Sequence, residues 1–153
     1  SALHVASYCN LPTKVAKILS SGEEKNSTDT QLWTPLHWAC LAKAKRPLTF
    51  SFLTVNTNAK DSVGWTPLFW AALNLLAVRL LLEAGAEVSF AAKQTPLHKA
   101  TFRRGVDFTE IVFKHGAHLE ARDAYGLTPL QQAILNGFEK TSKLLPENGA
   151  NVN

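Results

Sequence analysis

TPLHWAC, from Thr34 to Cys40, is the stretch of this sequence that decides its fold, because similar heptapeptides recur along the chain. The other copies are TPLFWAA from Thr66, TPLHKAT from Thr95, TPLQQAI from Thr128 and a more divergent SALHVAS from Ser1. Their starts lie 29 to 33 residues apart. Self-similarity at a period of about 20 to 50 residues is typical of proteins built from stacked repeats.

Each copy carries the signals of a helix start. A threonine hydroxyl can accept the unpaired N–H groups of a first helical turn, and proline fits the first helical position because it has no N–H to leave unpaired. Leu36, Ala39 and Cys40 then follow at the spacing that makes one apolar helix face. A second apolar segment ends before a glycine, as 80–82 does before Gly85, and glycine is the usual stop after a helix. We therefore predict two short helices in every repeat.

Four longer segments resemble ankyrin repeats: TPLHWA, LLLEAGAEV at 80–88, HGAHLEARDAYGLTPL at 115–130 and the closing NGANVN. The resemblance covers essentially the whole chain. It implies an all-α ankyrin-repeat solenoid of stacked antiparallel helix pairs, with short β-hairpin fingers and a concave binding face formed by the fingers and inner helices. We expect a single domain over 1–153, with repeat units of approximately 1–28, 29–60, 61–90, 91–122 and 123–153, the first lacking its finger.

Four places depart from the family pattern. Leu32 occupies the fingertip position where the family prefers glycine, and a leucine at positive φ costs about 1 kcal/mol or more, so we expect this tip to relax to another turn. The segment 46–55 is rich in β-branched and aromatic residues and is predicted to be the loosest interior helix. No glycine separates the two helices within 71–82, which must therefore turn within fewer residues, and the finger at 89–94 is short.

Composition fits an intracellular, soluble module. The 153 residues carry a net charge of +4 and contain no apolar run near the roughly 20 residues that span a bilayer, and no secretory signal is visible at the start. We expect no membrane insertion, a monomer, and a cytoplasmic or nuclear location. Cys9 and Cys40 are interpreted as reduced core or groove residues, because a disulfide scaffold is less consistent with this setting.

No catalytic, cofactor or metal site is predicted. His4, His37 and His98 recur at the same place in the repeat, so we interpret them as residues that tie each turn to its neighbour, whereas a catalytic histidine is needed once, with its own partners. Zinc could use His37 and Cys40 together with another such pair, but a spacing that the repeat itself generates is weak evidence, and no C-x-x-C is present.

The resemblance also implies which residues contact a partner: variable finger positions and the outward positions of the first helix in each repeat. The predicted contact set is Thr30, Gln31, Trp33, Trp38, Ser62, Val63, Trp65, Trp70, Lys99, Phe102, Arg103, Tyr125 and Leu127. It contains all four tryptophans, and central tryptophans at interfaces are each worth about 2 kcal/mol or more. The competing interpretation is that the tryptophans pack on the next repeat.

Charge suggests a partner class. Lys99, Arg103 and Arg104 follow one another without an acidic residue among them, which favours a basic groove beside the aromatic residues and hence an acidic peptide. A nucleic-acid or acidic-ligand binding surface is the alternative, since basic and aromatic residues together hold phosphates and bases, but a net charge of +4 is modest for binding nucleic acid. We interpret the chain as a non-catalytic protein-interaction module. Because it opens inside a repeat, we expect it to be the recognition segment of a larger protein.

Overall fold

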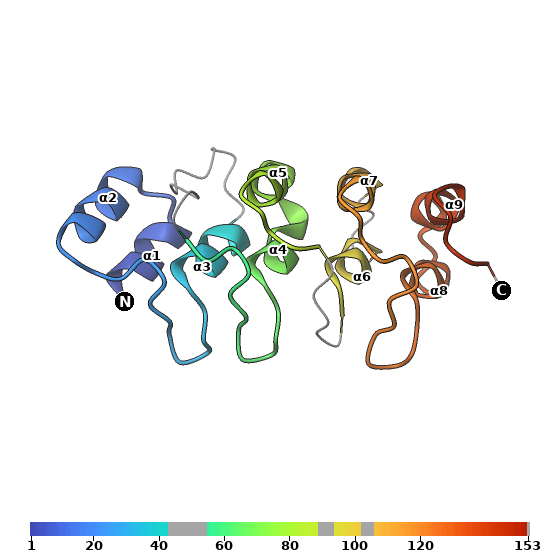
Figure 1. Cartoon of the computed structure of the whole chain (residues 1–153), viewed down its shortest axis with the longest axis horizontal. Helices are drawn as coiled ribbons and strands as arrows, with labels where there is room; N and C mark the ends of the chain where they lie inside the picture. The colour runs from blue at the N-terminus through green and yellow to red at the C-terminus, as the bar shows by residue number, and fades with distance from the viewer. Residues whose placement is uncertain (43–54, 89–93, 102–105, 153) are drawn as a thin grey trace. The chain divides into compact units, whose positions relative to one another are not determined.

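The structure is a computed structural model that describes residues 1–42, 55–88, 94–101 and 106–152 (Figure 1). The chain forms two compact units, Ser1–Ala86 and Glu87–Asn153, each of which is considered by itself. The division into one domain of five repeat units stays a prediction. The predicted loose helix at 46–55 and short finger at 89–94 fall almost wholly outside the described residues.

The first unit is built from short helices in pairs. They are α1 (Ala2–Tyr8), α2 (Pro12–Ser20), α3 (Pro35–Leu41), α4 (Pro67–Trp70), the 3₁₀ helix η2 (Ala71–Leu73) and α5 (Leu75–Glu83). Helix α1 packs on both α2 and α3, and α3 packs on α4, so the first helices of successive repeats lie side by side. The loops that precede α3 and α4 extend to the same side of these helices (Figure 1).

The second unit repeats the same arrangement. Its helices are α6 (Pro96–Thr101), α7 (Val106–Lys114), α8 (Pro129–Leu135) and α9 (Glu139–Glu147). Helices α6 and α8 pack together, as do α7 and α9, and each first helix packs on its own second helix. The predicted fold class, all-α with stacked helix pairs, is confirmed. Within the described ranges the fingers are hydrogen-bonded turns without an assigned strand.

The recurring heptapeptide holds each stack together. Its leucine is buried in every described copy, since Leu3, Leu36, Leu68, Leu97 and Leu130 are at most 3% exposed. Burying one leucine side chain contributes about 1.5 to 3 kcal/mol. The threonine before the proline has extended backbone at Thr34, Thr66 and Thr128, as expected for a residue that caps a helix. What recurs in the sequence is therefore the framework of the fold.

The predicted short turn between the helices of the third repeat is confirmed. Helix α4 is four residues long and continues into η2, and Asn74 follows with extended backbone. The Asn74 side chain then accepts a hydrogen bond from the backbone N–H of Ala77 at 3.2 Å, which caps α5. A single asparagine thus replaces the glycine turn that this repeat lacks. None of the helices in the described part of the chain is long and apolar enough to cross a bilayer.

The expectation that the fingertip at Leu32 relaxes to another turn was wrong. Leu32 has a φ of 57°, in the left-handed region that Gly64 and Gly126 occupy at the corresponding tips with φ of 90° and 76°. The finger itself imposes this conformation, because Leu32 N–H donates to the Asp29 carbonyl at 3.0 Å. Backbone strain persists where surrounding bonds over-determine the geometry.

Leu32→Gly is expected to raise the free energy of unfolding by about 0.5 to 1 kcal/mol. Relief of about 1 to 2 kcal/mol of left-handed strain exceeds the additional chain entropy of glycine, about 0.5 to 1 kcal/mol. The side chain is 50% exposed, so its removal forfeits little packing. Urea unfolding followed by far-UV circular dichroism measures the change. Leu32→Ala is the matched control, since alanine keeps the Cβ and the strain; equal midpoints for the two variants would contradict the argument.

Candidate interaction surface

An aspartate closes each described finger in the same way. One carboxylate oxygen of Asp29, Asp61 and Asp123 accepts the backbone N–H groups of the residues two and four positions later, at 2.8 to 3.0 Å. The backbone N–H of the aspartate in turn donates to the carbonyl of the residue four positions later, at 2.9 to 3.0 Å. Each finger is therefore fixed by its own hydrogen bonds before any partner arrives.

The second carboxylate oxygen joins the finger to the helix that follows it. It accepts the indole N–H of Trp38 at 2.8 Å from Asp29, and of Trp70 at 3.0 Å from Asp61. In the second unit the side-chain amide of Gln132 takes the same place at 3.5 Å from its finger aspartate. Burial raises the pKa of Asp29, but hydrogen bonds from the Trp38 indole and two backbone N–H groups outweigh it, so the pKa is lowered overall. The aspartate stays ionised and holds finger and helix together.

Each recurring histidine ties its own repeat to the next, as the sequence predicts. Nε2 of His4, His37 and His98 lies 2.9, 3.3 and 3.0 Å from the carbonyl oxygen of the residue before the next repeat's threonine. On the other side of the ring, Nδ1 of His37 and His98 accepts the backbone N–H of Thr34 and Thr95 at 3.1 and 3.2 Å. A ring with both nitrogens engaged in this way is a structural link.

These contacts require an uncharged ring. Nδ1 accepts an N–H, so Nε2 must carry the single proton and donate it to the carbonyl. Burial lowers the pKa of His37 and of His98, and the neighbouring carbonyl and carboxylate groups only partly offset this effect. His37 and His98 are thus neutral links at physiological pH.

Six aromatic rings of the first unit form one continuous row, which we call the aromatic ladder. In order, the ladder consists of Tyr8, Trp38, Trp33, Trp70, Trp65 and Phe69. Consecutive ring centroids lie 5.9, 5.6, 4.5, 5.2 and 4.3 Å apart. Aromatic pairs at such separations contribute about 0.5 to 1.5 kcal/mol each beyond the area they bury. The four predicted tryptophans are therefore neighbours in space.

The structure supports the packing interpretation of the tryptophans in part. Trp33 packs on Trp70 of the following repeat, and the N–H groups of Trp38 and Trp70 are used by the fingers, so packing accounts for much of their role. All four indoles are nevertheless half-buried, and Tyr8 at the end of the ladder is 46% exposed. A prearranged aromatic surface therefore reaches solvent, and its binding role stays a prediction.

Two polar residues of the predicted contact set, Gln31 and Ser62, link neighbouring fingers. The Gln31 carbonyl accepts the Ser62 N–H at 2.9 Å, and the Ser62 hydroxyl donates to the Gln31 side chain at 3.2 Å. Both residues are exposed, as is Thr30, and Val63 beside them is 52% exposed. The first two fingers are thus held in register while their tips remain accessible.

The remaining predicted contacts belong to the second unit or lie outside the described residues. Lys99 is half-buried on α6, Tyr125 is 84% exposed at its fingertip, and Leu127 is half-buried and offers its carbonyl to a histidine. Phe102 and Arg103 fall outside the described ranges. The predicted basic groove beside the aromatic residues therefore stays a prediction.

The cysteines and pockets offer little chemistry. Cys40 is buried, which raises the pKa of its thiol, whereas Cys9 is exposed. Among the described residues no three His, Cys, Asp or Glu side chains come together as a metal site.

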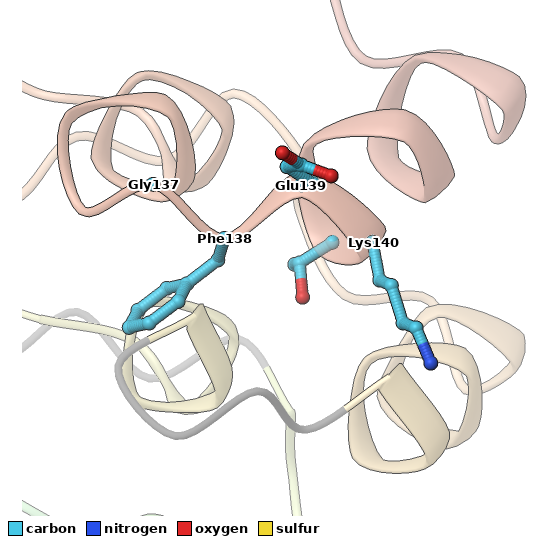
Figure 2. Close-up of a pocket in the computed structure, with 5 residues that line it drawn as sticks. Gly137, Phe138, Glu139 and Lys140 are labelled. Atoms are coloured by element: carbon cyan, nitrogen blue, oxygen red, sulfur yellow. The ribbon is translucent and has the colours of Figure 1, made fainter.

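An open pocket of about 400 Å³ lies at the turn between α8 and α9, where Phe138 and Lys140 extend to the same side of the ribbon (Figure 2). None of the residues reported to line it belongs to the predicted contact set.

Sequence reasoning missed the residues that position the ladder. Asp29 and Asp61 are not in the predicted contact set, although each lies nine positions before a tryptophan that it binds. This constant spacing was a usable signal. Phe69 was also missed; it stacks on Trp65 at 4.3 Å and 18° and takes the place of the histidine found in other copies.

Comparison with known proteins agrees with this geometry. The sequence profile of ankyrin repeats, described as three copies, matches residues 3–92 and 89–153. The chain is 39% identical over 59 residues to an ankyrin repeat protein of Rickettsia bellii, covering 38% of this chain and 25% of that protein. It is 26% identical over 158 residues to the B-cell lymphoma 3 protein homolog of Mus musculus, covering 97% of this chain and 35% of that protein. The human transient receptor potential cation channel subfamily A member 1 is 26% identical over 164 residues, covering 98% of this chain and 15% of that protein. The chain therefore spans about a third or less of each of these relatives.

Proposed function

The chain belongs to the ankyrin repeat family, and from this premise we propose that its first unit binds a partner protein or peptide through the aromatic ladder. Ankyrin repeats are generally protein–protein interaction modules and are typically non-catalytic. The observation that carries the proposal is the row of four half-buried tryptophans, two of which, Trp38 and Trp70, donate their indole N–H groups to finger aspartates. Aromatic residues that are already held in place bind with a smaller loss of side-chain entropy.

The accessible finger residues extend this surface. Thr30 is exposed beside the linked pair Gln31 and Ser62, so the partner meets polar groups at the edge of the ladder, next to the exposed apolar side chain of Val63. An aromatic centre with a polar rim is the usual composition of a protein interface. In this proposal the chain itself is non-catalytic, acts as a monomer, and serves as the intracellular recognition segment of a larger protein.

The double variant Trp33→Ala and Trp65→Ala is expected to lower partner affinity at least about tenfold, because interface tryptophans are each worth about 2 kcal/mol or more. Pull-down of partners by the two forms of the chain, followed by titration of the recovered partner, measures the change. Far-UV circular dichroism of both forms shows whether the variant remains folded.

The matched control is the double variant Leu75→Ala and Leu76→Ala. These leucines lie on α5, are 36% and 43% exposed, and belong to the same unit without contributing to the ladder. The control should recover partners as the unmodified chain does. Undiminished recovery of every partner by the folded tryptophan variant would eliminate the proposed surface.

A further inference from the structure

The ladder contains a corner of rings that stand steeply against one another. The ring of Trp38 makes an angle of 66° with that of Trp33 at 5.6 Å, and of 87° with that of Tyr8 at 5.9 Å. We call Tyr8, Trp33 and Trp38, with the Asp29 carboxylate, the Trp38 corner. It combines residues of α1, of the finger and of α3, which the helix packing and the finger hydrogen bonds bring together.

A negative charge lies at the edge of this corner. The Asp29 carboxylate accepts the indole N–H of Trp38 at 2.8 Å. An anion at the N–H edge increases the electron density that the ring presents at its faces, and ring faces attract cations. The pKa of Asp29 is lowered overall, so this charge is present at neutral pH. The local electrostatics therefore favour a positively charged guest.

The same carboxylate is poorly suited to a guest that brings N–H donors. One oxygen already accepts the backbone N–H groups of Gln31 and Trp33, at 2.9 and 3.0 Å, and the other accepts the Trp38 indole. A carboxylate offers about four lone-pair sites, so three are occupied. A lysine ammonium or an arginine would give up hydrogen bonds to water without regaining them here. An alkylated ammonium has few or no such bonds to lose.

We propose that the Trp38 corner binds an alkylated ammonium group, specifically the methylated lysine side chain of a partner peptide. The inference rests on the proposed function and names the chemistry of the residue that docks there. Aromatic faces gathered around one point are a known means of recognising quaternary ammonium groups, with about 0.5 to 2 kcal/mol for each favourable cation–π contact. A peptide is the chosen source because ankyrin repeats bind proteins.

This guest differs from the acidic peptide that the sequence favours. The basic residues behind that expectation are Lys99, Arg103 and Arg104, whereas the ladder consists of aromatic residues of the first unit. The charge that the structure places at the ladder is negative. The two expectations thus rest on different residues.

The test is a titration of the whole chain with a short peptide that contains trimethyllysine, followed by tryptophan fluorescence and by the NMR signals of the indole N–H groups. Two peptides of the same sequence serve as comparison, one with unmodified lysine and one with the neutral carbon isostere of trimethyllysine. We expect saturable binding of the trimethyllysine peptide, at least about tenfold tighter than either comparison peptide. Equal affinity for the neutral isostere would overturn the inference, because it would show that charge makes no contribution.

Variants locate the site. Trp38→Ala and Tyr8→Ala should each lower the affinity for the trimethyllysine peptide at least about fivefold. Leu76→Ala on α5 should leave this affinity unchanged. Tyr8→Ala is the safer variant, since its ring is 46% exposed, whereas the indole of Trp38 also holds the finger. Unchanged affinity in folded Tyr8→Ala and Trp38→Ala would overturn the assignment.

Two further outcomes separate this inference from the proposed function. If free choline binds as tightly as the peptide, the guest is a soluble ammonium compound and the peptide assignment fails. If no alkylated ammonium binds, yet the Trp33→Ala and Trp65→Ala chain loses its partners, the proposed function stands and the ammonium chemistry is wrong.

Discussion

Asp61→Ala is expected to lower the free energy of unfolding of the first unit by about 3 kcal/mol. Asp61 is 4% exposed, and its carboxylate accepts the N–H groups of Val63, Trp65 and the Trp70 indole, all within 3.0 Å. Hydrogen bonds to a charged group are worth about 1.5 to 3 kcal/mol, and donors left without a partner add about 1 to 3 kcal/mol where water cannot reach them. Urea unfolding followed by far-UV circular dichroism measures the loss, and the tryptophan emission should shift as the ladder loosens.

Two variants show whether the carboxylate itself is responsible. Asp61→Asn keeps the shape of the side chain but points an NH₂ group at one set of donors. It should therefore lower the free energy of unfolding by about 1 to 2 kcal/mol. Ser62→Ala, at the exposed neighbouring position, should stay within about 0.5 kcal/mol of the unmodified chain. If Asp61→Ala proved as stable as Ser62→Ala, the finger would not depend on its aspartate.

His37→Ala is expected to lower the free energy of unfolding by about 3 kcal/mol as well. The ring is fully buried, and its loss leaves the Thr34 N–H, the Thr34 hydroxyl and the Trp65 carbonyl without their present partner. A cavity adds to the cost of these lost hydrogen bonds. Denaturant midpoints measured on the variant and the unmodified chain give the difference.

The chain supplies its own control for this position. Gln131 stands at the place of the histidine in the last copy, and its side-chain oxygen accepts the Thr128 N–H at 2.9 Å. His37→Gln should therefore keep the helix cap and lose the bond to the Trp65 carbonyl. It should lower the free energy of unfolding by about half as much as His37→Ala does. An equal loss for glutamine and alanine would show that the cap contributes nothing.

The same histidine makes stability depend on pH. Because burial lowers the pKa of His37 and His98 below the ordinary value of 6.5, the unfolded chain binds protons more readily than the folded chain. The stability that the neutral rings provide is fully present above pH 6.5 and is lost as the pH falls below that value. Urea midpoints between pH 8 and about 5 should decline, and the decline should be shallower in His37→Gln. A flat profile in the unmodified chain would contradict this account.

The framework of the fold was readable from the sequence because it repeats. Threonine and proline mark where helices start, and the leucine that follows is buried in every described copy, as a shared spacing requires. The absence of glycine within 71–82 also predicted a short turn, and Asn74 makes it possible. At these positions the local preference of the residues and the packing of the repeats favour the same conformation. Either of them alone therefore predicts the structure found there.

The site was only partly readable. The tryptophans stood out by residue type, but their assembly into one ladder brings together residues that lie far apart in the sequence, such as Trp33 of a finger and Trp70 of α4. Leu32 illustrates a different limit, because its residue type disfavours the conformation that the finger's hydrogen bonds impose. Where several bonds compete with the preference of one residue, the sequence pattern alone cannot rank them.

The bonds from Asp29 and Asp61 to the tryptophans nine positions later make the aromatic surface modular. The contiguous segment from Asp29 to Trp38 contains the turn, the helix start and the indole that the turn orients. Grafted into another array in place of its counterpart, such a cassette should carry its ring orientation with it. The segment from Asp61 to Trp70 contains Phe69 as well, so grafting it replaces the histidine link by a ring stacked on Trp65. Among the residues described, the buried Thr66 hydroxyl has no hydrogen-bond partner, and the grafted segment should keep that feature.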